Sequence, residues 1–321
     1  MLKLRQLFST ALYNLFIKLS WLQRRRYTAW LWHALFSLSN SGFKNLVTTT
    51  IHGRKVKVNF GYPYPFIART IKTFNNPLVQ LVYESHRSKK KTMSIIDVGA
   101  SIGDTALLIF ANCPGMVRNI YCIEGESEFF RLLEDNMRNF LNVKPFRVML
   151  SSENGVSKKL VRIHAGTASS IGEGTVETLS LDTLIIKENI RDIDILKIDV
   201  DGYDGKVLLG ARKFLRKNSP SVIFEWHPLL CKNAGTSPHN HFKVLAHAGY
   251  SCFVFFTKLG EFSHFMSGYD YTTVENLAYY CMDTSAPDDW HYDVIALPKR
   301  STLNPLSLAT LHYARKKPSP F

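Results

Sequence analysis

Between residues 94 and 297 the chain alternates short apolar strands with helices. The first strand, 94–99, ends in a glycine turn, and a helix is expected directly after it at 102–111. The remaining expected elements are strands at 119–123, 145–150, 193–198, 222–224, 252–256 and 293–297, and helices at 127–140, 203–216 and 241–248. Strands and helices that alternate in this way form parallel sheets with helices on both faces. We therefore expect an α/β, Rossmann-like fold with a seven-stranded, mostly parallel sheet.

Composition divides the chain into four segments. Residues 1–45 form a helical, basic extension without an acidic residue, and 46–93 form a lead-in that contains aromatic residues and prolines. Residues 94–300 hold the α/β domain, and 301–321 form a basic tail. Within the domain, the long interval 257–291 departs from the strand–helix rhythm, so we expect a lid or an acceptor-binding loop there.

Apolar residues recur at helical spacing near the N-terminus, at positions 4, 7, 8, 12, 15, 16, 19 and 22. This period predicts an amphipathic helix. Lys18 interrupts the apolar run before it reaches the ~20 residues of a membrane span. Two interpretations stay open. The helices dock on the α/β domain or on a second subunit, which would make a homo-oligomer, or they lie on a membrane surface.

The formal net charge of +14 favours an anionic partner such as nucleic acid, an acidic glycan or a membrane surface. No RNA-binding aromatic motif and no helix-turn-helix pattern accompanies this charge, which argues against nucleic acid. The five cysteines form no CxxC pair and no complete disulfide set, which indicates a reducing environment. We therefore expect a cytoplasmic protein, which could be peripherally bound to a membrane. The spacing of cysteines and histidines supports no metal site.

The glycine turn after the first strand is typical of a nucleoside-binding site. Gly99 and Gly103 allow the strand to turn tightly into a helix while the backbone approaches a ligand. Glu124 ends the second strand, 27 residues after Asp97, where a carboxylate can accept both ribose hydroxyls of an adenosine-containing cofactor. These features indicate a nucleoside ligand without saying which one.

The spacing in the turn favours S-adenosylmethionine over NAD. The dinucleotide fingerprint needs a middle glycine where Ser101 stands, because a pyrophosphate must approach the backbone there. Asp97 would repel a pyrophosphate, whereas a carboxylate suits the ammonium and sulfonium groups of S-adenosylmethionine. The expected cofactor-binding residues are Asp97, Gly99, Ala100, Ser101, Gly103, Glu124, Ser151 and Asp199.

Three stretches, 97–103, 196–211 and 220–225, resemble the FkbM-type methyltransferases in their order and spacing. They include Asp97-Val98-Gly99-Ala100-Ser101-Ile102-Gly103 and Leu196-Lys197-Ile198-Asp199-Val200-Asp201-Gly202. Members of that family commonly have Asn in place of Ser101 and Glu in place of Asp201, so this chain departs at both positions. The resemblance implies a class I fold and methyl transfer from S-adenosylmethionine to a hydroxyl, often on a sugar or a polyketide-like compound.

A hydroxyl acceptor benefits from a general base at the carboxyl ends of the fourth and fifth strands. The expected catalytic residues are His227, Glu225 and Asp201, in that order, because histidine titrates nearest neutrality and His227 follows the strand directly. Tyr62 and Tyr64, in the proline-rich segment of the lead-in, would either stack on a sugar ring or pack in the core.

We therefore expect an O-methyltransferase that acts on a sugar, a glycan or a small hydroxylated metabolite. One alternative is a catalytically inactive protein of the same fold that serves as an assembly or membrane-surface partner. The intact residues Asp97, Gly99, Gly103 and Glu124 favour the enzyme. An RNA methyltransferase is less favoured, because the Asn/Asp-Pro-Pro-Tyr motif of amine-methylating enzymes is absent after the fourth strand.

Overall fold

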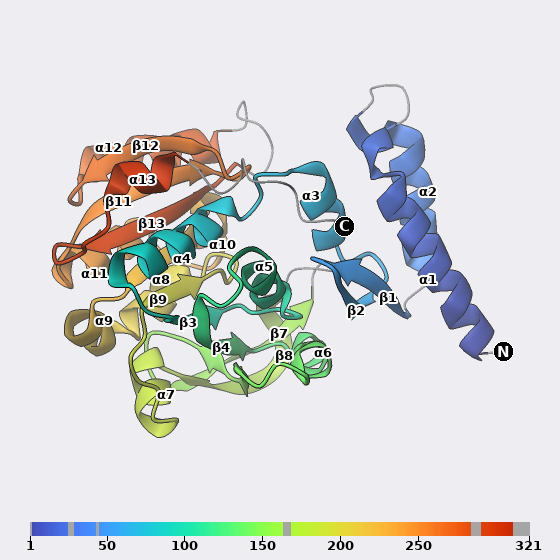
Figure 1. Cartoon of the computed structure of the whole chain (residues 1–321), viewed down its shortest axis with the longest axis horizontal. Helices are drawn as coiled ribbons and strands as arrows, with labels where there is room; N and C mark the ends of the chain where they lie inside the picture. Colours follow the sequence, from blue (N-terminus) through green and yellow to red (C-terminus); the bar gives the residue numbers. More distant parts are fainter. Residues whose placement is uncertain (1, 25–28, 43–44, 163–167, 284–289, 311–321) are drawn as a thin grey trace.

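A computed structural model describes residues 2–24, 29–42, 45–162, 168–283 and 290–310. Its centre is an eight-stranded sheet with the strand order β12-β11-β13-β10-β9-β3-β4-β5 (Figure 1). The strands are β3 (Met93–Val98), β4 (Val117–Glu124), β5 (Val143–Arg147), β9 (Ile195–Ile198), β10 (Ser221–Trp226), β11 (Tyr250–Thr257), β12 (Phe262–Ser267) and β13 (Tyr292–Pro298). The α/β fold expected from the sequence is confirmed.

The sheet is parallel across its centre and antiparallel at one side. β10, β9, β3, β4 and β5 pair in parallel, whereas β13 runs antiparallel to both β10 and β11. The carboxyl ends of β3, β4, β9 and β10 therefore meet at one edge, where a ligand is expected in such a fold.

The interval 257–291 is not the loop that the sequence predicted. Among its described residues it holds the edge strand β12, which pairs antiparallel with β11, and the helix α12 (Tyr271–Met282). The sheet thus has eight strands where seven were expected. β12 escaped detection because only Met266 of its side chains is buried, so the strand lacks an apolar face.

Two further expected elements are divided. The strand predicted at 145–150 becomes β5 and the short β6 (Met149–Leu150), which joins β7 (Gly155–Arg162) and β8 (Ala168–Leu179) in a separate three-stranded sheet. The helix predicted at 203–216 becomes α8 (Asp204–Leu209) and α9 (Arg212–Asn218).

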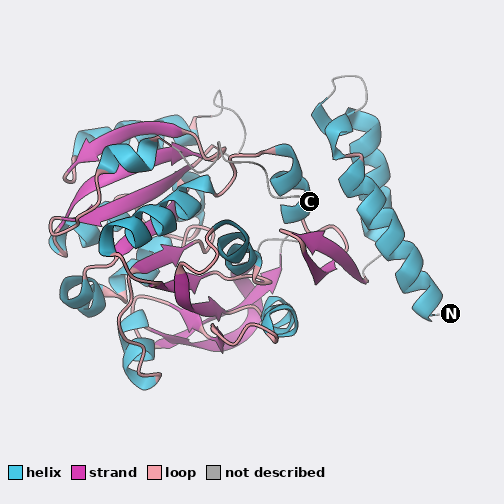
Figure 2. Cartoon of the chain, viewed as in Figure 1, coloured by secondary structure: helices cyan, strands magenta, loops and turns pink. Residues whose placement is uncertain are grey.

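Helices cover both faces of the central sheet (Figure 2). One face packs against α4 (Asn76–Lys89), α5 (Asp104–Asn112), α6 (Ser127–Met137) and the short α13 (Pro305–Ala309). The other packs against α7 (Leu181–Lys187), α8, α9, α11 (Asn240–His247) and α12. Neighbouring strand residues such as Ile95 and Ile96 are both fully buried and belong to opposite clusters, as the alternation along a strand requires.

The N-terminal segment forms a helical hairpin beside the domain. α1 (Leu2–Lys18), the 3-10 turn η1 (Ser20–Arg24) and α2 (Ala29–Gly42) precede the hairpin of β1 (Leu46–Ile51) and β2 (Arg54–Asn59), and then α3 (Tyr64–Thr70). Figure 1 shows α1 and α2 at the edge of the molecule, beyond β1, β2 and α3. Tyr13 and Phe16 on α1 are buried in the cluster that includes β1, β2 and α3. No helix within the described ranges is long and apolar enough to cross a membrane.

Candidate active site

A cleft of about 780 Å³ opens at the carboxyl ends of β3, β4, β9 and β10. Seven of the predicted site residues line it: Gly99, Ser101, Glu124, Asp199, Asp201, Glu225 and His227. The sequence therefore identified part of the polar wall of the cleft. Residues from β5–β6 and from the lead-in complete it, including Val148, Met149, Leu150, Tyr62 and Tyr64.

The glycine turn brings β3 and β9 into close contact. Gly99 has a φ of 78°, and a Cβ atom at this position would lie 1.8 Å from the carbonyl oxygen of Asp199. Any side chain would therefore push the two strands apart. Gly103 has a φ of 91°, and its missing Cβ leaves room for Met137 of α6. Both glycines thus shape the turn, and only Gly99 lines the cleft.

Glu124 is held rigidly at the end of β4. Its Oε2 accepts the backbone N–H of Ser101 at 2.8 Å, and its Oε1 accepts that of Glu126 at 2.7 Å. Each oxygen retains a second lone pair for a hydroxyl that enters the cleft. Burial raises the pKa of Glu124 to about 7, although the two backbone N–H groups oppose the shift.

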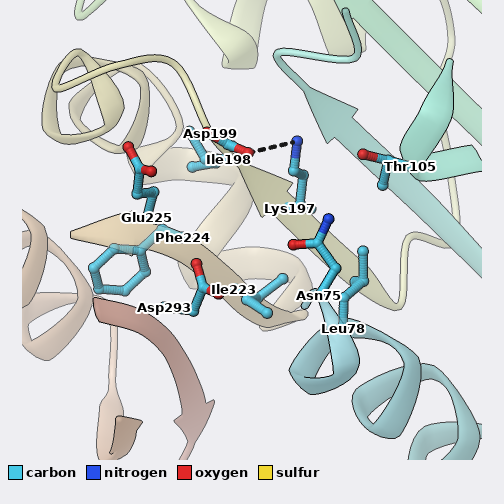
Figure 3. Close-up of a pocket in the computed structure, with 10 residues that line it drawn as sticks. All are labelled: Asn75, Leu78, Thr105, Lys197, Ile198, Asp199, Ile223, Phe224, Glu225 and Asp293. Carbon is cyan, nitrogen blue, oxygen red and sulfur yellow. Dashed lines mark ion pairs between the residues drawn. The ribbon is translucent and has the colours of Figure 1, made fainter. Parts of the chain in front are cut away.

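Asp97 lies beneath the cleft rather than in its wall. Its side chain is fully buried, and its Oδ1 forms an ion pair with the Nζ of Lys197 at 3.0 Å. Lys197 also donates to the carbonyl oxygen of Gly99 at 3.2 Å and lies 3.4 Å from the Oδ2 of Asp199. Figure 3 shows Lys197 directed toward Asp199, whose side chain is half exposed. Asp97 therefore fixes Lys197, and Lys197 connects the turn with the end of β9.

Lys197 was not among the residues predicted from the sequence to form the site. Burial disfavours its charge, but the carboxylates of Asp97 and Asp199 more than compensate, so the pKa of Lys197 lies above its usual range. The signal was a single cation inside an otherwise apolar strand, Ile195-Leu196-Lys197-Ile198, since lysine is rarely buried without a partner.

Tyr62 connects the lead-in with the glycine turn. Its hydroxyl donates to the Oδ2 of Asp104 at 3.1 Å and lies 3.0 Å from the Oγ of Ser101. Burial raises the pKa of Asp104 to about 6. Tyr62 and Tyr64 are both buried in the core and line the cleft, so they serve packing and the wall at once. The sequence did not point to Asp104.

The expected base candidates gather where β10 ends. The Oε1 of Glu225 lies 3.4 Å from the Nε2 of His291, and the ring of His291 stacks on that of His227 with centroids 5.2 Å apart. The Nδ1 of His227 accepts the backbone N–H of Leu230 at 3.4 Å and so caps α10 (Pro228–Asn233). His291 belongs to the interval expected to form a loop, and it lines the same cleft.

Several carboxyl groups make this end of the cleft acidic. Burial, with further contributions from Asp199, Asp204, Asp201 and Asp293, raises the pKa of Glu225 well above its usual range. Burial and the charge of Asp199 raise the pKa of Asp293, which pairs with Glu225 across β10 and β13, to about 7. No group of three or more His, Cys, Asp or Glu side chains in the described part of the chain could hold a metal ion.

Asp201 and three of the predicted cofactor-binding residues lie in turns or outside the lining of the cleft. Asp201 lies in the turn after β9 with a φ of 50°, a conformation that its short polar side chain tolerates. Ala100, Gly103 and Ser151 do not line the cleft. The backbone N–H of Ser151 instead donates to the carbonyl oxygen of Leu179 at 2.9 Å.

Residues 97–252 match the family model described as the methyltransferase FkbM domain. The hexuronic acid methyltransferase AglP of Haloferax volcanii is 32% identical over 177 residues, which cover 54% of this chain and 68% of AglP.

Two solved structures are similar at low sequence identity. Methyltransferase FkbM from Methylobacillus flagellatus is 15% identical with a TM-score of 0.38, and the match covers 64% of this chain and only 43% of that chain. The O-methyltransferase from Bacillus cereus is 12% identical with a TM-score of 0.37, over 70% of this chain and 80% of that one.

Proposed function

The chain belongs to the FkbM methyltransferase family, and from this premise we propose that it transfers a methyl group from S-adenosylmethionine to a hydroxyl group of a sugar or glycan. The geometry of Glu124 carries the cofactor assignment. A carboxylate at the end of the second parallel strand, fixed by two backbone N–H groups and open to the cleft, suits the two hydroxyls of a ribose.

The remaining cofactor contacts are assigned by charge and position. The half-exposed carboxylate of Asp199, just after β9, would accept hydrogen bonds from the ammonium group of the cofactor, and the backbone at Gly99 and Ser101 would pack along it. Asp97 would act through Lys197, because its side chain does not reach the cleft wall. Bound S-adenosylmethionine supplies a methyl group on a positively charged sulfur, so the protein needs only to position the acceptor and to remove its proton.

His227 is the proposed general base. It lines the cleft and follows β10 directly, where a base would face an acceptor hydroxyl. Glu225 is a weaker candidate than the sequence suggested, because burial beside other carboxylates raises its pKa and so disfavours the ionised form that would act as a base. The contact between Glu225 and the Nε2 of His291 would instead hold the His291 ring against His227.

The sugar acceptor is supported by the relative AglP, whose name states that it methylates hexuronic acid. Tyr62 and Tyr64 add aromatic surface to the cleft wall, and aromatic rings pack well against the apolar faces of sugar rings. An acceptor with a hydroxyl beside a ring face therefore fits both the lining and the chemistry.

The test is a calorimetric titration with S-adenosylmethionine, followed by incubation with hexuronic acids, neutral hexoses and their glycosides and by mass detection of an added methyl group. A mass increase of one methyl group on a sugar hydroxyl, absent in Glu124→Ala, is the expected result. Tight cofactor binding without methylation of any acceptor would instead favour the inactive assembly partner. No cofactor binding at all would overturn the proposal.

A further inference from the structure

The helix α1 is apolar on two opposite sides. Its inner side carries Tyr13 and Phe16, which are buried against Phe60, α2 and α3. Its outer side carries Leu4, Leu7, Phe8 and Leu15, which are 74%, 67%, 60% and 50% exposed. At 100° per residue these four positions fall within about 100° of arc, on the side opposite Tyr13 and Phe16. The four side chains therefore form one largely exposed apolar stripe.

The helix α2 also has apolar side chains on both its inner and its outer side. Trp32 and Phe36 stack on each other on the inner side with ring centroids 4.9 Å apart, and Phe36 packs on Phe66 of α3. Trp30, Leu31 and Leu35 lie on the outer side, where Trp30 is 68% exposed. The hairpin thus presents large apolar side chains away from the domain on both helices. A helix that is apolar on two opposite sides needs a second apolar environment for its outer face.

The positive charge of the N-terminal segment indicates which apolar environment the outer face would contact. Residues 1–45 contain seven Lys or Arg residues and no Asp or Glu. A symmetric contact with a second copy would bring two positively charged hairpins together, whereas the surface of an anionic bilayer is attractive to both the charges and the apolar stripe. With 17 and 14 residues, the helices are shorter than the ~20 residues needed to span a bilayer.

We propose that the outer face of the α1–α2 hairpin, formed by Leu4, Leu7, Phe8, Leu15, Trp30, Leu31 and Leu35, inserts into the surface of an anionic phospholipid bilayer. The hairpin lies at the edge of the molecule, so this face can meet a flat surface without obstruction by the central sheet (Figure 1). Tyr13 of α1 is hydrogen-bonded to Tyr62 in the cleft wall, so insertion of the hairpin would hold the active site beside the membrane. The inference does not depend on the identity of the acceptor.

Flotation of the full chain with phosphatidylcholine vesicles, with and without phosphatidylglycerol, tests the proposal. We expect binding to the anionic vesicles that weakens as salt is added. The outer-face variant Leu4→Ser, Leu7→Ser and Phe8→Ser should lower binding about tenfold or more, since it removes apolar area that enters the lipid. A matched control replaces Leu141 and Ile186, which are 97% and 77% exposed elsewhere, with Ser and should bind as the wild type does.

Two readouts keep the outcome decisive. Circular dichroism and S-adenosylmethionine titration of the outer-face variant should match the wild type, because the substituted side chains are largely exposed and are not part of the buried core. The proposal fails if the full chain does not float with anionic vesicles at low salt, or if the outer-face variant floats equally well. A dimer in analytical ultracentrifugation that the outer-face variant abolishes, without lipid binding, would assign the face to a second copy instead.

Discussion

The hydroxyl of Tyr13, on the first helix, donates a 2.6 Å hydrogen bond to the carbonyl oxygen of Tyr62. Tyr13 is fully buried, and the hydroxyl of Tyr62 in turn contacts Ser101 in the glycine turn. A short chain of contacts therefore joins the N-terminal hairpin to the proposed cofactor site. The basic N-terminal extension therefore helps to hold Tyr62 in the wall of the cleft.

Replacing Tyr13 with Phe should lower the free energy of unfolding by about 1–2 kcal/mol. The change keeps the ring contacts with Phe60 and Phe66 but leaves the buried carbonyl of Tyr62 without its donor. Urea denaturation measures the difference. Tyr279→Phe, at a tyrosine that is 72% exposed, should have almost no effect, and an equally small effect at Tyr13 would contradict the inferred role.

Substitution of Glu124 should weaken S-adenosylmethionine binding by a few kcal/mol at most, through the loss of charge-assisted hydrogen bonds. The ionised carboxylate is the better acceptor for ribose hydroxyls. Because its pKa is about 7, we expect the affinity to rise as pH increases through neutrality.

Calorimetry in buffers of different ionisation enthalpy should detect proton release on binding near pH 7, and Glu124→Gln should abolish that release. Glu128→Gln, at an exposed position of α6 outside the cleft, is the control. Unchanged cofactor affinity in Glu124→Ala would mean that Glu124 has only a structural role.

Much of the cleft was predictable because parallel strands bring their carboxyl ends together. The positions of Gly99, Glu124, Asp199 and Glu225 followed from the strand pattern alone, since each stands at or just after the end of a strand. No contact between distant segments had to be known to place them.

The contributions that the sequence did not reveal depend on tertiary packing. Tyr62 and His291 come from segments outside the central strand–helix repeat, so no local pattern connects them with the turn or with β10. The burial of Asp97 and the raised pKa of Glu225 likewise depend on neighbours brought together by the fold. Local periodicity cannot report such desolvation.

Lys197→Met should destabilise the protein by about 3–5 kcal/mol, because it leaves the fully buried Asp97 without its cation. The double variant Lys197→Met with Asp97→Asn should recover part of this loss, since no uncompensated charge remains. Chemical denaturation of both variants and of Asp97→Asn completes the cycle. A cost below about 1 kcal/mol for Lys197→Met would show that the pair contributes little.

The free energy of unfolding should fall as the pH rises from about 6.5 to 8. Glu124 and Asp293 have pKa values of about 7 in the folded protein, above those of the unfolded chain, so the folded state holds more protons in this range. His52 and His241, whose pKa values burial lowers to about 4, act only below this window, where they favour folding as pH rises. Denaturation at several pH values should show the slope, and Asp293→Asn should reduce it.

The base at the end of β10 is tested by single-turnover methylation of the acceptor that the sugar panel identifies. His227→Ala should lower the rate by roughly 10²–10⁴-fold while leaving S-adenosylmethionine affinity nearly unchanged. Glu225→Gln should stay close to the wild-type rate, because the amide keeps the shape of the carboxyl group and the raised pKa of Glu225 disfavours a role as the base. Asp201→Asn should also have a small effect if His227 accepts the proton.

The same assay separates the alternatives. A large loss in Glu225→Gln with a normal rate in His227→Ala would assign the base to Glu225 despite its burial. A loss confined to His291→Ala would place the base on β13's side of the cleft, where His291 faces Glu225 at 3.4 Å. If His227→Ala, Glu225→Gln, Asp201→Asn and His291→Ala all keep near-normal rates, methyl transfer relies on positioning alone.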